Sequence, residues 1–418
     1  MRIDLRRRAS RLAALAALAL ICAPSISSAA ELGADLDSLL AYARAQSPEL
    51  AAMRHEAEAA AERIQPAGAL PDPVLRVELE NLGNDTGAAR EARYTLMQGF
   101  PLGGKRGLRR DAASADAQQA QARADAAWSE LAAKLKTGFA QYFAAAGSER
   151  LVREQVELLA RLEQTARQRY AAGLGSQQDA IRAQLEQTAM RAELIALANE
   201  TQQARVRLNA LLARDAAAPL AEPGAPRPLP AVNVYDAATL AQRARSANPL
   251  LAAEAARLRA AQSNRELASR NHIPDLQLGL APVQMGSRIA SWGVMVELNI
   301  PLQRETRRSQ QREADAMANA QRARADALAS QLLGELGEQL SALDAARRTE
   351  ALITDELLPQ TELALRSALA AYEAGKAEFA MLLDTERQIR KARQDRLKAQ
   401  ADAQMRVAEI ERIVGEEL

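Results

Sequence analysis

The feature that most constrains this chain is an internal duplication. Four short landmarks recur in the same order at offsets of 200 to 203 residues, which chance matching would not produce. The pairs are Ser47–Leu50 with Asn248–Leu251, Pro71-Asp72 with Pro274-Asp275, Phe100–Leu102 with Ile300–Leu302, and Tyr170–Gly173 with Tyr372–Gly375. We therefore expect a first repeat at 31–215 and a second repeat at 235–418, joined by a proline-rich linker at 216–234 that is too stiff and extended for a helix.

Each repeat has the same expected order: two short helices, a β-hairpin, a very long helix and a returning helix. Apolar and polar residues alternate in the hairpin segments, which predicts strands. These lie at about 73–82, 92–101, 273–281 and 291–301, with the segments NLGNDTG and PVQMGS as the turns.

The remaining segments carry apolar residues at helical spacing, with alanine at many other positions. They lie at about 103–171, 176–213, 304–373 and 377–416. A helix over 103–171 would span roughly 100 Å. Gly173 and Gly375 are suited to end the long helices, and Pro359 predicts a kink or break inside the second one.

The first thirty residues have the pattern of a secretory signal peptide. Arginines precede an apolar run at Leu12–Cys22, and the small residues Ser28, Ala29 and Ala30 offer a cleavage site before Glu31. Cys22 is the one cysteine of the chain. It follows Ile21, where a lipid-modified cysteine prefers a small residue, so the sequence favours its loss with the leader.

Charge and composition exclude several functions. Without residues 1–30, the chain has 49 basic and 52 acidic residues, a balance that gives no support for a nucleic-acid partner. The rest of the chain has no run of about 18 apolar residues, so the sequence predicts no membrane-spanning helix there. His55 and His272 are the only histidines and stand apart, and no catalytic motif is present, so we expect no enzyme, no cofactor and no dedicated metal site.

The stretch QGFPLGGKRGLRR at 98–110 superficially resembles a phosphate-binding loop. Phe100 stands where that loop needs its first glycine, and Arg106 stands where it needs serine or threonine. The second repeat has NIPLQRETRRSQ at the same place, with no Gly-Gly-Lys. We interpret the stretch as a junction between strand and helix. Its candidate residues are Pro101, Gly103, Gly104, Lys105 and Pro301, with Lys105 expected in water.

Four amphipathic strands cannot close a barrel alone, and two isolated hairpins are marginal in water. A sheet that spans lipid must be closed, because an open edge leaves backbone groups unpaired. For an exported chain, this combination indicates a barrel shared among protomers.

Taken together, these residues resemble the TolC-like outer-membrane efflux channels over essentially the whole mature chain. The resemblance rests on the duplicated order of elements, on GFPLGG and NIPL, and on RYAAGLGSQQDAIRAQ and AYEAGKAEFAMLLDTERQ. PLGGKR together with PDPVLRVELEN is most similar to the branch that serves heavy-metal efflux.

The resemblance implies a mainly α fold with a pair of β-hairpins, assembled as a homotrimer. Three protomers would form one twelve-stranded β-barrel in outer-membrane lipid, continued by an α-helical barrel through the periplasm. A periplasmic adaptor protein would link this passive, gated duct to an inner-membrane RND-type pump.

The resemblance also implies site residues at the far helical turns. Asp179 and Asp384 would ring the pore as a gate, although Asp179 with Ser176 also fits a helix start. The family pattern has a further acid at Met381 and a basic residue at Ala377, both absent here. The candidates for adaptor docking are Tyr170, Gly173, Leu174, Gly175, Ser176, Tyr372, Gly375 and Lys376, for which simple turn chemistry is the alternative.

Three other functions stay open on the sequence. The chain is alternatively a channel for drugs or organic solutes, an exported coiled-coil scaffold, or a periplasmic adaptor. An adaptor would be expected to carry a compact β-rich segment between its helices, and the sequence has no such segment.

Overall fold

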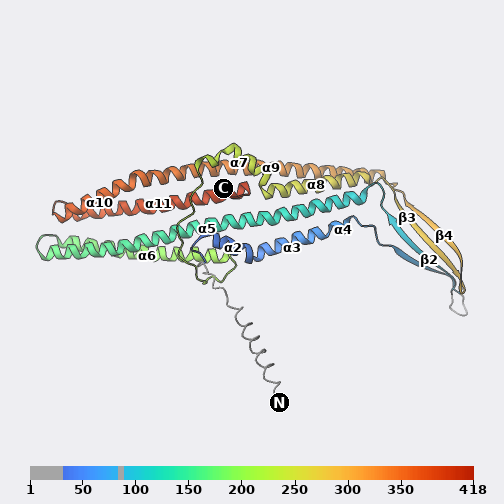
Figure 1. The fold of residues 1–418 in the computed structure, drawn as a ribbon, viewed down its shortest axis with the longest axis horizontal. Helices are drawn as coiled ribbons and strands as arrows, with labels where there is room; N and C mark the ends of the chain where they lie inside the picture. Colours follow the sequence, from blue (N-terminus) through green and yellow to red (C-terminus); the bar gives the residue numbers. More distant parts are fainter. Residues whose placement is uncertain (1–31, 83–88) are drawn as a thin grey trace, which may run out of the picture.

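The computed structural model describes residues 32–82 and 89–418 (Figure 1). The molecule is elongated, with helices along most of its length and strands extending from one end. The expected signal peptide at 1–30 and the greater part of the NLGNDTG turn lie outside the described residues.

The described elements follow the duplicated order. The first repeat contains α2 (Leu36–Gln46), α3 (Pro48–Glu62), α4 (Ile64–Ala67), β1 (Val74–Leu82), β2 (Ala89–Phe100), α5 (Lys105–Ala171) and α6 (Gln177–Leu211). The second contains η1 (Val232–Tyr235), α7 (Ala237–Ala247), α8 (Pro249–Arg270), β3 (Asp275–Met285), β4 (Arg288–Asn299), α9 (Arg304–Leu352), η2 (Ile353–Leu357), α10 (Leu358–Glu373) and α11 (Phe379–Val414).

The short helices of both repeats begin with the same capping chemistry. The side chains of Asp35 and Asp236 each accept a hydrogen bond from the backbone N–H three residues on, at 2.7 and 2.8 Å. Ser47 and Asn248 cap α3 and α8 in the same way, each followed by proline in the first turn. The capping side chains satisfy backbone N–H donors that a helix start leaves free, and the prolines remove one such donor.

The described strands form one antiparallel sheet in the order β1-β2-β3-β4. The two hairpins meet along β2 and β3, where Leu96 pairs with Leu280. The strands extend further toward the turns than expected: β2 begins at Ala89, β4 begins at Arg288, and β3 continues through the predicted turn segment as far as Met285. Gly286 has a φ of 60° and allows a tight turn, after which Arg288 pairs with Met285.

Large apolar side chains remain exposed on this sheet. Leu75 and Val77 of β1 are 63% and 50% exposed, and Trp292 and Val294 of β4 are 63% and 79% exposed. In the described chain, β1 and β4 each have a strand neighbour on one side only. One protomer therefore leaves both the apolar stripe and the sheet edges uncovered.

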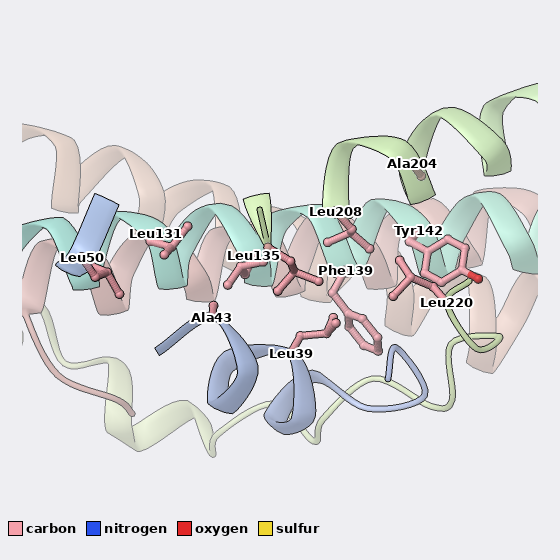
Figure 2. Close-up of a cluster of buried hydrophobic side chains, with 11 residues drawn as sticks. Leu39, Ala43, Leu50, Leu131, Leu135, Phe139, Tyr142, Ala204, Leu208 and Leu220 are labelled. Atoms are coloured by element: carbon pink, nitrogen blue, oxygen red, sulfur yellow. The ribbon is translucent and has the colours of Figure 1, made fainter. Parts of the chain in front are cut away.

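Figure 2 shows the hydrophobic core of the first repeat, where α2 packs against α5 and α6. Leu39, Leu135 and Leu208 are fully buried there. The second repeat builds a corresponding cluster from α7, α9 and α11, with Leu240 and Ile410 fully buried. Each repeat thus buries its short first helix against its own long pair.

The long helix of the second repeat changes its winding before Pro359. The π-helical turn η2 covers Ile353–Leu357, and α10 begins at Leu358 with the proline in its first turn. Proline lacks an N–H and clashes with the carbonyl of a preceding helical turn, so a local π turn accommodates it. In the first repeat, α5 continues without interruption through Leu158.

Between the repeats, the chain from Ala218 to Ala231 is neither helix nor strand. It is held at several points: the Gly224 N–H donates to the Ala34 carbonyl at 2.9 Å, and Arg347 donates to the Pro230 carbonyl at 2.6 Å. Of the helices in 32–82 and 89–418, none has the length and apolarity needed to cross a membrane.

Candidate functional site

The chain forms two long helical hairpins, one of α5 and α6 and the other of α9, η2, α10 and α11. Their turns lie together, at the opposite end of the molecule from the strands (Figure 1). Gly173 and Gly375 both have a φ of 71°, a conformation that side chains with a Cβ disfavour. The N–H of the next residue, Leu174 or Lys376, closes each turn with a 2.8 Å hydrogen bond to a carbonyl five residues back. Both glycines therefore terminate their helices as predicted.

Arg169 joins the two turns. Its guanidinium donates to the Glu373 carbonyl at 2.9 Å and to the Leu174 carbonyl at 3.2 Å. It also lies 5.1 Å from the centre of the Tyr372 ring. Sequence reasoning did not identify this residue. The available signal was a break in the duplication, because the second repeat has Ala371 at the corresponding position.

The two tyrosines proposed for docking have different environments. Tyr372 is 3% exposed and its ring packs 5.2 Å from that of Phe379, whereas Tyr170 is 50% exposed. Burial, and then the charge of Asp179, raise the pKa of Tyr372, against the opposing effect of Arg169. Tyr372 is thus a packing residue between the hairpins, and Asp179 lies near it.

Most of the other docking candidates are accessible. Leu174 is 69% exposed, Lys376 is exposed, and Gly175 is half-buried against Arg169. Ser176 has a structural task in addition, since it caps α6 by accepting the Gln178 N–H at 3.1 Å. These turn residues therefore form an exposed rim at the end of the hairpins.

The two gate candidates have different surroundings. Asp179 lies in the first turn of α6 and is half-buried, a place where the helix dipole favours a carboxylate. The Asp384 side chain is 67% exposed, and its Oδ1 lies 3.4 Å from the nearer guanidinium nitrogen of Arg387.

A row of ion pairs connects α6 to α11 above the turns. Arg387 contacts Glu186 through two nitrogens, at 3.0 and 2.5 Å. Arg390 contacts Glu193 at 2.9 Å, and Gln394 donates to the same carboxylate at 3.1 Å. The hydrogen bond from Arg387 lowers the pKa of Glu186. These ties, which sequence reasoning also missed, connect the hairpin of one repeat to that of the other.

At the opposite end, Lys105 contradicts the expectation that it lies in water. Its side chain is 5% exposed, and Nζ donates to the Ile273 carbonyl at 2.7 Å and to Asp275 at 2.8 Å. The Leu102 N–H also donates to Asp275. The buried charge is therefore paired, and it attaches the start of α5 to the start of β3.

Gly103 and Gly104 provide the bend at this junction, as predicted. Their φ values are 71° and 76°, and a Cβ on Gly103 would stand 2.5 Å from the Ile273 side chain. Pro101 directly follows β2, and Pro301 follows the end of β4 after Ile300. Ile273 lies so close to Gly103 that a larger residue would clash there. Packing therefore explains this glycine without a phosphate-binding role.

Replacing Lys105 with methionine is expected to destabilise the folded chain by about 1–3 kcal/mol, because Asp275 loses a charged donor. Urea unfolding in detergent would measure the loss. Lys134→Met is the matched control, since its pair with Glu130 is more than half exposed at the lysine and is worth about 0–1 kcal/mol. Equal losses in both variants would contradict the structural role of Lys105.

The described residues contain no group of three or more His, Cys, Asp and Glu side chains arranged to hold a metal ion. His55 lies 3.0 Å from Glu58, with both side chains exposed, and His272 contacts the Ser269 carbonyl at 2.6 Å. Both histidines thus have local structural partners.

Comparison with known proteins places these features in a family. The family model of the outer membrane efflux protein matches residues 39–214 and 240–416. The chain is 27% identical over 388 residues to the cobalt-zinc-cadmium resistance protein CzcC of Cupriavidus metallidurans, covering 91% of this chain and 90% of that protein.

Solved structures share the fold. The outer-membrane channel OprN superposes with a TM-score of 0.76 at 20% identity, covering 91% of this chain and 89% of OprN. CusC, which forms a transmembrane channel, superposes with a TM-score of 0.76 at 16% identity, covering 91% and 92%. Because the family model matches both repeats and most of the chain, this protein belongs to the outer membrane efflux protein family.

Proposed function

We propose that this protein is the exit duct of a tripartite efflux system, working as a homotrimer. The observation that carries the proposal is the open-edged sheet with exposed apolar residues at one end of the long helices. In lipid, every sheet edge must be paired. Three copies joined edge to edge, β4 to β1, would close one twelve-stranded barrel and turn the apolar stripe to the lipid.

The helices would continue this barrel as a tunnel through the periplasm. At 1.5 Å per residue, α5 alone spans roughly 100 Å, and it runs from the junction at Lys105 to the turn at Gly173. The exposed rim that includes Tyr170, Leu174 and Lys376 would meet the periplasmic adaptor, which links the duct to an inner-membrane RND-type pump. The pump would supply the energy, and this chain would supply the gated passage.

The cargo we propose is heavy-metal cations. The support is the resemblance to CzcC, a cobalt-zinc-cadmium resistance protein, over nine tenths of both chains. A duct needs no tight metal site, because an ion that binds tightly would not leave. Drugs or other organic solutes are the alternative cargo within the same family.

Expression of the full precursor, followed by membrane fractionation and planar-bilayer recording, tests the duct. We expect a trimer in the outer-membrane fraction that conducts ions. A monomer in the soluble periplasmic fraction would instead support a coiled-coil scaffold or adaptor. Complementation of a host that lacks its own duct, challenged with cobalt, zinc and cadmium salts or with organic drugs, would separate the two cargo classes.

Asp384 is the stronger of the two gate candidates, because its exposed carboxylate has no capping role that would explain it otherwise. In a trimer, three such groups at a constriction would attract cations and repel anions. Asp384→Ala is therefore expected to raise the conductance and to lower the cation-over-anion permeability ratio in bilayers. Asp326→Ala, an exposed acid on α9, is the control. Unchanged permeability in Asp384→Ala would remove Asp384 from the gate.

A further inference from the structure

A carboxyl group with no partner is buried beside the ties between α6 and α11. Glu386 is fully buried, and neither of its carboxyl oxygens has a hydrogen-bond partner among the described residues. Arg390 lies one helical turn further on, and its Nε is also buried without a partner. Glutamate and arginine four residues apart on a helix ordinarily pair in this orientation. Here Arg390 reaches across to Glu193 of α6 instead.

The charges that act on Glu386 come from two helices. Arg387 and Arg390 belong to α11 itself, and Glu186 and Glu193 face it from α6. The adjoining faces of α5 and α10 belong to the hydrophobic cluster at the helical tips, which includes Val152, Leu159, Ala368 and Leu383. Gln155, between Val152 and Leu159 on α5, is neutral and also buried. The two cations that act on Glu386, Arg387 and Arg390, are both already paired with acids of α6.

This setting favours the protonated carboxyl. The pKa of Glu386 is raised to about 7, chiefly by burial; Arg390 and Arg387 oppose the shift, and Glu186 and Glu193 add to it. While Glu386 is neutral, Arg387 and Arg390 stay paired with Glu186 and Glu193 of α6. An ionised Glu386 needs a donor, and Arg390 stands four residues on in the same helix, the spacing at which the two side chains can pair.

We propose that Glu386 is a proton-operated latch between the two helical hairpins of each protomer. When Glu386 is protonated, Arg390 holds Glu193 and α11 stays tied to α6. When Glu386 loses its proton to solvent, its carboxylate takes Arg390, Glu193 is released, and the hairpins separate at the tunnel end. This latch rests on the proposed duct, because it controls how readily that end opens.

The position of the ties makes such a latch effective. Among the described residues, the polar contacts between α6 and α11 are those of Glu186 and Glu193, and Arg169 adds a link between the hairpins at the turns. Loss of Arg390 from α6 leaves the Arg387–Glu186 pair to hold that stretch. One proton therefore acts on one of the two arginine pairs between α6 and α11.

Planar-bilayer recording between about pH 5.5 and about pH 8.5 brackets the pKa of about 7 and tests the latch. Wild-type open probability is expected to rise through this range. Glu386→Gln, which keeps the neutral form, should hold the low-pH value throughout, and Glu193→Gln should open already at low pH. Glu378→Gln, an exposed acid at the start of α11, is the matched control and should keep the wild-type response.

A second readout does not depend on conduction. Spin labels at Gln184→Cys on α6 and Lys391→Cys on α11, both exposed positions, report the distance between these helices. We expect that distance to lengthen above pH 7 in the wild-type background and to stay constant with Glu386→Gln. A pH response that Glu386→Gln leaves intact in either measurement overturns the latch. Absence of conductance at every pH would overturn the duct instead, and the label distances would still decide the latch.

Discussion

Glu411→Ala is expected to lower the free energy of unfolding by about 3–5 kcal/mol, the usual effect of breaking a buried ion pair from one side. Glu411 of α11 is 4% exposed. Its carboxylate accepts from Lys136 of α5 at 2.8 Å, from Arg227 of the linker, and from the Leu418 N–H at 3.1 Å. Its removal leaves the 7%-exposed Lys136 side chain with only the outer acid Glu417.

Denaturant unfolding of the detergent-solubilised protein measures this loss. Glu416→Ala is the matched control, because its pair with Arg243 is partly exposed and is worth about 0–1 kcal/mol. The double variant Lys136→Met/Glu411→Leu should recover much of the stability, since it removes both buried charges together. A loss for Glu411→Ala as small as that of the control would show that the buried network contributes little.

The second large effect is expected from the paired substitution Arg387→Ala/Arg390→Ala, which removes both arginine ties between α6 and α11. We expect a several-fold rise in bilayer conductance, because near the turns the two hairpins would then be held by the Arg169 hydrogen bond and by apolar packing alone among the described contacts. Arg393→Ala is the control, since Arg393 pairs with Glu362 inside the hairpin of the second repeat. Equal conductance in the paired variant and the wild type would show that the ties do not restrain the tunnel end.

The same substitution has an expected signature in acid. The pKa of Glu186 is lowered from its ordinary value of 4.5 by the hydrogen bond from Arg387. The pair therefore contributes its full stability above pH 4.5 and loses it as the pH falls through the lower folded-state pKa. In thermal unfolding, the wild type should lose this contribution on acidification, and the paired variant should lack it at every pH.

The local sequence pattern was sufficient to predict much of the fold. Alternation of apolar residues indicated each of the four strands, and the Schellman-type glycines at 173 and 375 ended the long helices where expected. The end of β3 was misjudged because Pro282 was interpreted as a turn residue, whereas the ladder accommodates it opposite Trp292. A proline can join a sheet where the partner strand does not need its N–H, and only the register settles that.

Some site residues could likewise be predicted from the local sequence, and others could not. Gly103 and Gly104 were correctly expected to bend the chain, because their conformational freedom is a local property. The partners of Lys105 lie 168 and 170 residues away in sequence, so its burial could not be predicted. Tyr170 and Tyr372 occupy equivalent places in the two repeats, yet only Tyr372 has a ring partner in Phe379.

The sequence by itself determined the duplicated architecture, the long helices, the strands and the family resemblance, because period, punctuation and repetition act over short distances. Only the tertiary structure decided which charges are buried and which are paired. Lys105, Lys136, Glu386 and Glu411 look like ordinary members of solvated helix faces in the sequence. Their burial depends on which segment of the other repeat lies against them, and that packing is set by contacts more than a hundred residues apart.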